Sequence, residues 1–170
     1  MSGFPQRISS ANRGGGKPRA MRQIGDTRLA LAAESVGLCR WVIDFVTDHI
    51  SRPHRSGAPL GDREGVRLRY ADMRIRAYAA RSMVYRTARL GDAGENIVNE
   101  GIAAKVFATE AIGEIVDTGI QLVGGGALRN GHPLEALNRR VRALRLAEGA
   151  SDVLRLNLAR GRLDLSKGRI

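Results

Sequence analysis

Two places in this 170-residue sequence carry side chains that could do chemistry. The first is Glu148, a lone carboxylate that stands directly before Gly149 and a predicted helix start. A carboxylate can act as a general acid or base where its surroundings are dry enough to raise its pKa. Many carboxylates at the start of a helix have no such role and only interact with the helix dipole. The position alone leaves both interpretations open.

The second place is the segment from Gln121 to Gly126, which follows a long helical pattern and contains three consecutive glycines. Glycine lets another molecule approach the backbone closely, and a glutamine amide offers both a donor and an acceptor. Such a segment suits contact with a phosphate or a flat ring. The structural alternative is a glycine stop at the C-terminus of a helix, followed by a loop.

The histidines and the cysteine predict no further reactive centre. His49, His54 and His132 are scattered and lack the usual spacing of metal ligands, so no metal site is predicted. Cys39 is the only cysteine, which excludes an intramolecular disulfide and favours a cytoplasmic location. No apolar run approaches the roughly 20 residues of a membrane helix, and the N-terminus lacks the apolar core of a signal peptide. We therefore expect neither a membrane span nor a secretory signal.

The net charge of +11 comes from 28 basic residues, of which only Lys17, Lys105 and Lys167 are lysine. A basic surface can attract nucleic acid, anionic lipid or a polyphosphate cofactor. The plainer interpretation is a preference for arginine on solvated helix faces. The arginines are spread along the whole chain, and only Trp41, three Phe and three Tyr could stack on bases. Both facts argue against binding of single-stranded nucleic acid.

The hydrophobic pattern predicts the elements that position these residues, and all of them are helices. Residues 1–19, rich in Gly, Ser and Pro, are expected to form a flexible basic arm, and 166–170 a tail. Between them, residues 20–165 are predicted to form an all-α antiparallel bundle. Three long helices are expected: the first from Asp26 or Thr27 to Pro53, the second from its cap Asp62 to about Leu90, and the third over 95–122. Two short helices are expected over 133–143 and from Ala150 or Ser151 to about Arg160.

Several short motifs, in order from residue 20 to 163, together resemble the C-terminal helical domain of acyl-CoA dehydrogenases. No single motif decides the resemblance, but their order and spacing do. They are Ala20-Met21, Asp26-Thr27-Arg28, Val36-Gly37, Tyr70-Ala-Asp-Met73, Ala104-Lys105 with Ala108-Thr-Glu-Ala111, Gln121-x-x-Gly124-Gly125, Pro133-Leu-Glu with Arg139 to Arg142, and Glu148-Gly149.

The resemblance implies a flavin enzyme that oxidises an acyl-CoA thioester at its α and β carbons. It assigns Glu148 as the base that takes the α-proton, while a hydride passes to FAD. It places Arg28 and Gly149 on the substrate side. The resemblance also implies FAD contacts across a subunit interface; the residues concerned are Gln121, Gly124, Gly125 and, as the nearest counterpart of an FAD-phosphate arginine, Arg52, with Arg55 as the alternative.

The sequence departs from the family pattern in side chains and in extent. Ala127 stands for a glycine, Arg140 for an aspartate, Ala147 for an aromatic residue and Ala150 for a threonine or serine. Family members also have an N-terminal helical domain and a β-rich middle domain, which build the other half of the pocket. We therefore expect a dehydrogenase part, either completed by a second polypeptide or produced by a split or truncated gene. The alternative is a non-catalytic oligomerisation or scaffold module. A homo-oligomer, dimer or tetramer, formed through the bundle is expected in both cases.

Overall fold

The computed structural model describes residues 16–170, apart from residue 56, and in this part of the chain it is an all-α bundle. The prediction of three long and two short helices is confirmed, and no β-strand occurs among these residues. The helices are α1 (Gly16–Ser51), α2 (Glu64–Asp92), α3 (Val98–Val123), α4 (Pro133–Leu144) and α5 (Ser151–Leu163), with 3-10 turns η1 (Leu60–Asp62) and η2 (Gly125–Leu128).

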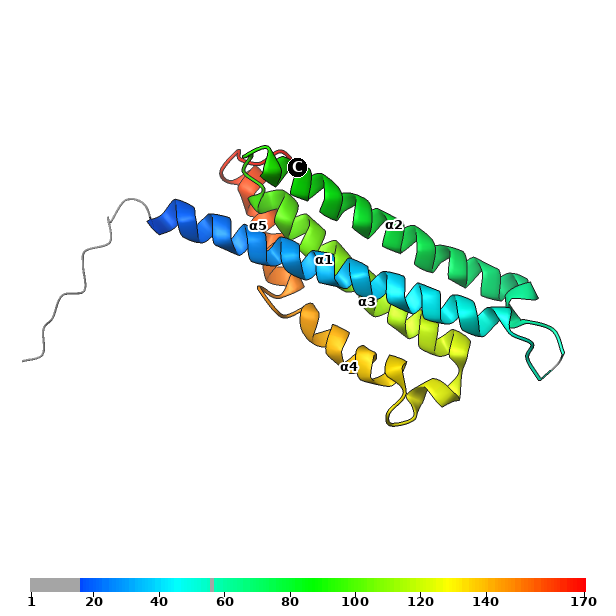
Figure 1. The fold of residues 1–170 in the computed structure, drawn as a ribbon. Helices are drawn as coiled ribbons and strands as arrows, with labels where there is room; N and C mark the ends of the chain where they lie inside the picture. The colour runs from blue at the N-terminus through cyan, green and yellow to red at the C-terminus, as the bar shows by residue number, and fades with distance from the viewer. Residues whose placement is uncertain (1–15, 56) are drawn as a thin grey trace, which may run out of the picture.

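Helix α3 is the centre of the bundle and contacts each of the other four helices. In Figure 1 the chain runs from left to right along α1, back along α2 and from left to right again along α3, and α4 then returns beside α3. Helices α1 and α3 therefore run in the same direction. Gly25 at the start of α1 packs beside Ile97, whereas a Cβ built at Gly119 near the end of α3 would lie 3.2 Å from Val42.

The central place of α3 follows from its composition. Its buried face carries branched side chains such as Ile112, Ile115 and Val116, which pack in the main core against α1 and α4. Small residues such as Ala104 and Ala108 let α1 and α2 approach its other sides. A helix that is apolar on most of its surface is stable only when other helices cover it on several sides.

The start of α1 differs from the prediction. The helix begins at Gly16, so neither Asp26 nor Thr27 is an N-cap, and the Thr27 hydroxyl donates to the Gln23 carbonyl inside the helix at 2.9 Å. The helix continues through Gly25 because this glycine packs against the first turns of α3. The last part of the predicted arm, 16–19, thus belongs to α1, and residues 1–15 lie outside the described residues.

The start of α2 also differs. Asp62 lies in η1 and does not cap α2, which begins at Glu64 after an N-cap residue, Arg63, that makes no side-chain cap bond. The turn is closed instead by Arg67, whose guanidinium donates to the Gly61 carbonyl at 2.7 Å and lies 3.7 Å from the Asp62 carboxylate. By contrast, Pro133 starts α4 as predicted.

Candidate functional site

The predicted site residues fall into two groups at opposite ends of the bundle. Because α1 and α3 run in the same direction, Arg28 and Lys105 lie near their beginnings, whereas Arg52 and Gln121 lie near their ends. Glu148 belongs to the first group. Lys105 and Gln121, both on α3, are about 24 Å apart at a rise of about 1.5 Å per residue.

The first group is built around the turn 145–151, which joins α4 to α5 and which we call the Glu148 turn. Glu148 has a φ of 55° and Gly149 a φ of 111°, both in the left-handed region. A Cβ on Gly149 would lie 3.0 Å from a methyl carbon of Leu154, so only glycine fits there. Glutamate rarely adopts this conformation and keeps it only where the surroundings enforce it.

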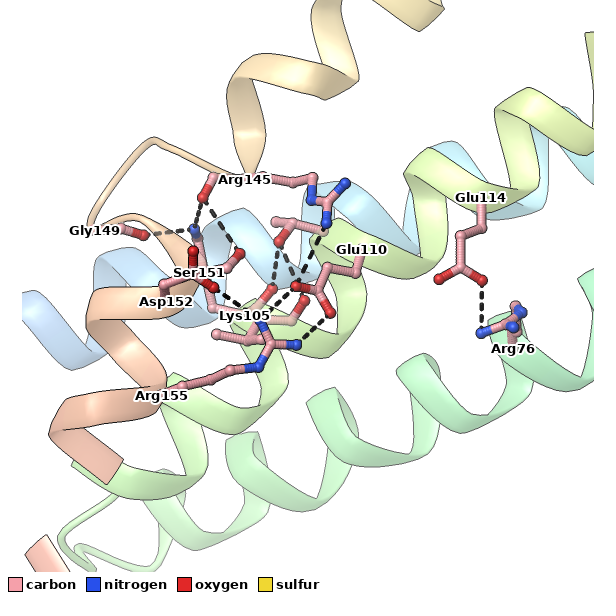
Figure 2. A network of polar contacts seen from close by, with 11 residues as sticks. Arg76, Lys105, Glu110, Glu114, Arg145, Gly149, Ser151, Asp152 and Arg155 are labelled. Carbon is pink, nitrogen blue, oxygen red and sulfur yellow. Dashed lines mark hydrogen bonds and ion pairs between the residues drawn. The ribbon is translucent and has the colours of Figure 1, made fainter. Parts of the chain in front are cut away.

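A buried lysine of α3 holds the Glu148 turn in place. Lys105 is completely buried, and its Nζ donates to the Gly149 carbonyl at 2.9 Å and to the Arg145 carbonyl at 3.3 Å (Figure 2). The backbone N–H of Ser151 closes the turn by donating to the same Arg145 carbonyl at 3.1 Å. The turn is thus tied to α3 through its backbone, independently of the Glu148 side chain.

Arg28 reaches the turn from α1. Its Nε donates to the backbone carbonyl of Glu148 at 3.2 Å, and the Glu148 side chain remains exposed. Burial lowers the pKa of Arg28, and the nearby Glu148 carboxylate opposes this shift. Burial also lowers the pKa of Lys105, and the neighbouring charge of Arg28 lowers it further. Three elements, α1, α3 and the turn, therefore meet at Glu148.

An ion-pair cluster fixes α5 beside the turn. The Glu110 carboxylate on α3 accepts two hydrogen bonds from the Arg155 guanidinium, at 2.6 and 2.7 Å, and lies 3.7 Å from Arg145 (Figure 2). The hydrogen bond from Arg155 holds the pKa of Glu110 below its usual value. Both ends of the turn are therefore connected to α3, at Lys105 and at Glu110.

A cleft of about 820 Å³ opens beside this group, between the beginnings of α1 and α3, the end of α5 and the C-terminal residues. Arg28 lines it together with other basic side chains, among them Arg160, Lys167 and Arg169. Glu100 is buried at its edge, with Oε1 3.6 Å from the Arg169 guanidinium and without a hydrogen bond among the described residues. The cleft thus combines positive charge with one buried carboxylate.

Sequence reasoning missed the supporting groups of this end. Lys105 entered the sequence interpretation only as part of a family motif, and Glu100 and Glu110 did not enter as site residues. A signal was present for Lys105, because a lysine inside the apolar run from Ala104 to Val106 lies on a face that must be buried. A lysine is almost never fully buried without partners, so its position predicts buried acceptors.

The second group lies at the glycine end. Gly124 has a φ of 86° and stops α3, with its N–H donating to the Ile120 carbonyl at 2.8 Å. A Cβ built at Gly124, Gly125 or Gly126 would meet no atom within 4 Å, so the space beside this backbone is open. Ala127, which replaces the last glycine of the family motif, is completely buried in the core. The backbone of this turn is therefore accessible to another molecule.

Gln121 and Arg52 are both exposed at this end. Gln121 borders a surface cleft of about 400 Å³ together with Arg69 and Asp72 of α2. The Arg52 guanidinium pairs with Asp48, one turn earlier on α1.

Three aromatic rings, those of Trp41, Phe45 and His132, link α1 to the start of α4. Phe45 stacks on Trp41 at 5.4 Å between ring centroids and meets His132 edge-on at 5.7 Å. His132 also caps α4, because its Nδ1 accepts the Leu134 N–H at 3.2 Å. The histidine is thus occupied by structural contacts.

The structure offers no metal-binding cluster in the part of the chain that it describes. Among residues 16–170 apart from 56, no three His, Cys, Asp or Glu side chains lie close enough together to hold an ion. In the same residues, none of the helices has the length and apolar character needed to cross a bilayer.

The family model of the acyl-CoA dehydrogenase C-terminal domain matches residues 14–163. The chain belongs to the acyl-CoA dehydrogenase family. An acyl-CoA dehydrogenase of Bacillus subtilis is 29% identical over 141 residues, which cover 83% of this chain and 37% of the relative. The acryloyl-CoA reductase (NADH) of Anaerotignum propionicum is 27% identical over 158 residues, covering 91% of this chain and 40% of the relative.

Solved structures of the family share the fold. Butyryl-CoA dehydrogenase from Megasphaera elsdenii superposes with a TM-score of 0.80 at 22% identity, over 85% of this chain and 38% of that one. The chain therefore spans well under half the length of these family members. It corresponds to their helical C-terminal domain.

Proposed function

We propose that this chain is the C-terminal helical part of an FAD-dependent acyl-CoA dehydrogenase, with Glu148 as the catalytic base. The observation that carries the proposal is the Glu148 turn, in which a carboxylate sits in a left-handed conformation enforced by Lys105 and Arg28. A conformation of this kind is costly for glutamate and is found mainly where function requires it. Family membership supplies the reaction class.

The chemistry assigned to Glu148 is removal of the α-proton of an acyl-CoA thioester, whose carbonyl acidifies that proton. FAD supplies the acceptor for the hydride that leaves the β-carbon, so the substrate loses one proton and one hydride and gains a double bond. The exposed Glu148 carboxylate becomes an effective base only when water is excluded around it. The N-terminal and middle domains of the family would supply that cover.

The cleft beside Arg28 is proposed as the place of the CoA part of the substrate. Its basic side chains, Arg28, Arg160 and Lys167, suit the phosphate groups of CoA. Gly149 belongs to the same side because its carbonyl and that of Glu148 form the edge of the turn above Lys105 and Arg28.

The separation of the two ends supports a homo-oligomer, a dimer or tetramer. Gln121, Gly124 and Gly125 lie at the end of α3 away from Glu148, and Arg52 lies at the corresponding end of α1. We propose that these residues contact the FAD that serves the Glu148 of another copy. The open space beside the glycines supports this contact, because nothing in the described part of the same chain fills it.

One observation favours a second candidate, a non-catalytic oligomerisation or scaffold module. Helix α2 exposes a row of large side chains, Leu68, Ile75, Tyr78 and Tyr85, each more than half accessible to solvent. These residues recur at helical spacing on an outer face, where they are available to a second copy. A cleft between α2 and α3 carries both signs of charge, with Arg69, Arg76, Glu114 and Asp117, which permits self-complementary pairing.

The test is co-expression with a polypeptide that supplies the N-terminal and middle domains. We expect a yellow complex that releases FAD on denaturation and that reduces a dye only when acyl-CoA is present. Glu148→Gln should retain the complex and its FAD but lose at least about 100-fold in kcat, the usual range for removal of a general base. A colourless complex would contradict the dehydrogenase proposal and favour the scaffold, whereas full activity of E148Q would contradict the assignment of Glu148 as the base.

A further inference from the structure

We infer that Lys105 is a positioning residue: its ammonium group sets the conformation of the Glu148 turn and thereby the direction in which Glu148 is presented. The catalytic part of this inference rests on the proposed function. The structural part concerns the turn itself and can be tested on the 170-residue chain alone.

The first support is the burial of Lys105 combined with the identity of its partners. Its side chain is fully buried. Among the described residues with less than 2% exposure, Lys105 has the largest side chain. A buried ammonium group is strongly unfavourable unless hydrogen bonds replace its water. Here the replacements are backbone carbonyls of Arg145 and Gly149, so the burial of the charge and the shape of the turn depend on each other.

The second support is where these two carbonyls lie. They flank Glu148, three residues before it and one residue after it, so a single charged group spans the segment that carries the candidate base. Within that segment both Glu148 and Gly149 have positive φ. The left-handed glutamate is disfavoured on its own and requires bonds of this kind to persist.

The third support is the contrast with the other contacts of the turn. Arg28 donates one bond to Glu148 from α1, but it is only half-buried, so water can compete with it. The Ser151 hydroxyl reaches the Arg145 carbonyl only at 3.4 Å. Lys105 is the one fully buried charge among these contacts, and water cannot replace it there.

Lys105→Met separates positioning from packing. Methionine retains an unbranched apolar stem of similar length but has no N–H donor, so the Gly149 carbonyl loses its partner and the Arg145 carbonyl keeps only its bonds from Ser151. The matched control is Arg76→Met, which removes an arginine that pairs with Glu114 at 2.7 Å between α2 and α3, away from the turn (Figure 2). Lys105→Arg keeps a donor and serves as the conservative variant.

Hydrogen–deuterium exchange of the full chain is the direct measurement. In K105M we expect amide exchange of Leu146, Ala147 and Ser151, whose N–H groups are hydrogen-bonded in the turn, to rise about tenfold or more, with the middle of α1 and α3 unchanged, since a hydrogen bond to a charged group is lost. R76M should leave the turn at the wild-type rate, and K105R should restore most of the protection. Wild-type exchange of the turn in K105M would overturn the inference.

If the K105M protein does not fold, the K105R variant tests whether the turn needs a hydrogen-bond donor at position 105. Protection of the turn in K105R close to that of the wild type supports the need for a donor. A folded K105R whose turn exchanges as fast as an unstructured peptide, although the guanidinium keeps its donors, overturns the inference.

The catalytic consequence is measured in the completed FAD complex. K105M should lower kcat by about tenfold or more while KM for acyl-CoA and FAD content change less than about twofold, since only the base is misplaced. Adding K105M to E148Q should cause little further loss, because both changes act through one group. A fully additive loss would overturn the positioning role. Full activity of E148Q would instead overturn the proposed function, and hydrogen exchange would still decide the role of Lys105 in the turn.

Discussion

The two ends of the bundle that carry the candidate residues are built on opposite principles. At the Glu148 end, a buried Lys105 and the Glu110–Arg155 pair hold the backbone in a conformation that it would not adopt alone. At the glycine end, Gln121 is exposed and the space beside Gly124 and Gly125 is open. The first end is preorganised by its own chain, whereas the second offers access to another molecule.

The comparison shows why a family resemblance carries different weight at the two ends. A buried charge must be satisfied within the chain, so the contacts of Lys105 are determined by this fold. An exposed glutamine and an open glycine turn have no such requirement, and their role depends on what binds there. The Glu148 end can therefore be tested in the isolated chain, whereas the role proposed for the glycine end can be tested only in a complex that contains FAD.

The largest expected effect comes from a pair of glycine substitutions, one at each end. Gly149→Ala should lower the free energy of unfolding by about 3 kcal/mol, because alanine is strained at positive φ and its Cβ would collide with Leu154. Gly125→Ala should change it by less than about 1 kcal/mol, because its Cβ would point into open space. Urea denaturation of both variants measures the difference. Equal losses would show that the ends do not differ in rigidity.

At about pH 10, a smaller effect is expected from Cys39, which lies in the core between the two ends. Burial raises the pKa of its thiol to about 12, against an ordinary value of 9.0. Between these values the unfolded chain loses the thiol proton and the folded chain keeps it. The free energy of unfolding should therefore fall by about 1.4 kcal/mol for each pH unit above about 9.

Urea denaturation at several pH values checks this slope. Cys39→Ala should remove the thiol's contribution above about pH 9 while leaving the curves below about pH 8 parallel to those of the wild type. The native thiol should also resist alkylation until the core opens, which makes it a reporter of global unfolding. If it reacts before urea unfolds the helices, local opening of α1 rather than global unfolding exposes it.

The smallest effect is expected from the ion pair that fixes α5 at the Glu148 end. The pKa of Glu110 lies below its ordinary value because of Arg155, so its stabilising contribution is complete above about pH 4.5 and is lost as the pH falls through the lowered value. Arg155→Met should cost about 1 kcal/mol at pH 7, since the arginine is half-exposed. In the wild type, acid should loosen α5 before the core of α1 and α3.

Hydrogen exchange measured at about pH 3 and about pH 6 distinguishes the local stability of α5 from that of α1 and α3. Glu110→Gln should remove most of the pH dependence at α5, and R76M, at the other ion pair of α3, should retain it. Simultaneous loss of protection in α5 and in the centre of α3 would mean that the Glu148 end has no separate stability.

Sequence periodicity was sufficient to predict the helices, because an apolar face repeats within one helix and can be counted locally. It failed at Asp62 and at Thr27, which have the right chemistry for a helix cap. At Asp62 the contacts of Arg67 decide the turn, and at Thr27 the packing of Gly25 on α3 lets the helix continue. A residue with good capping chemistry indicates only that a helix can start at that position.

The sequence by itself determined the all-α bundle, the family and the order in which Gln121, Glu148 and Gly149 occur along the chain. Only the tertiary structure decided that Glu148 and Gln121 lie at opposite ends, and that Lys105 meets carbonyls 40 and 44 positions later in the chain. The physical reason is the distance along the sequence over which the interactions act. Helical patterns arise from neighbours within a turn or two, whereas the partner of a buried charge is selected by how whole helices pack.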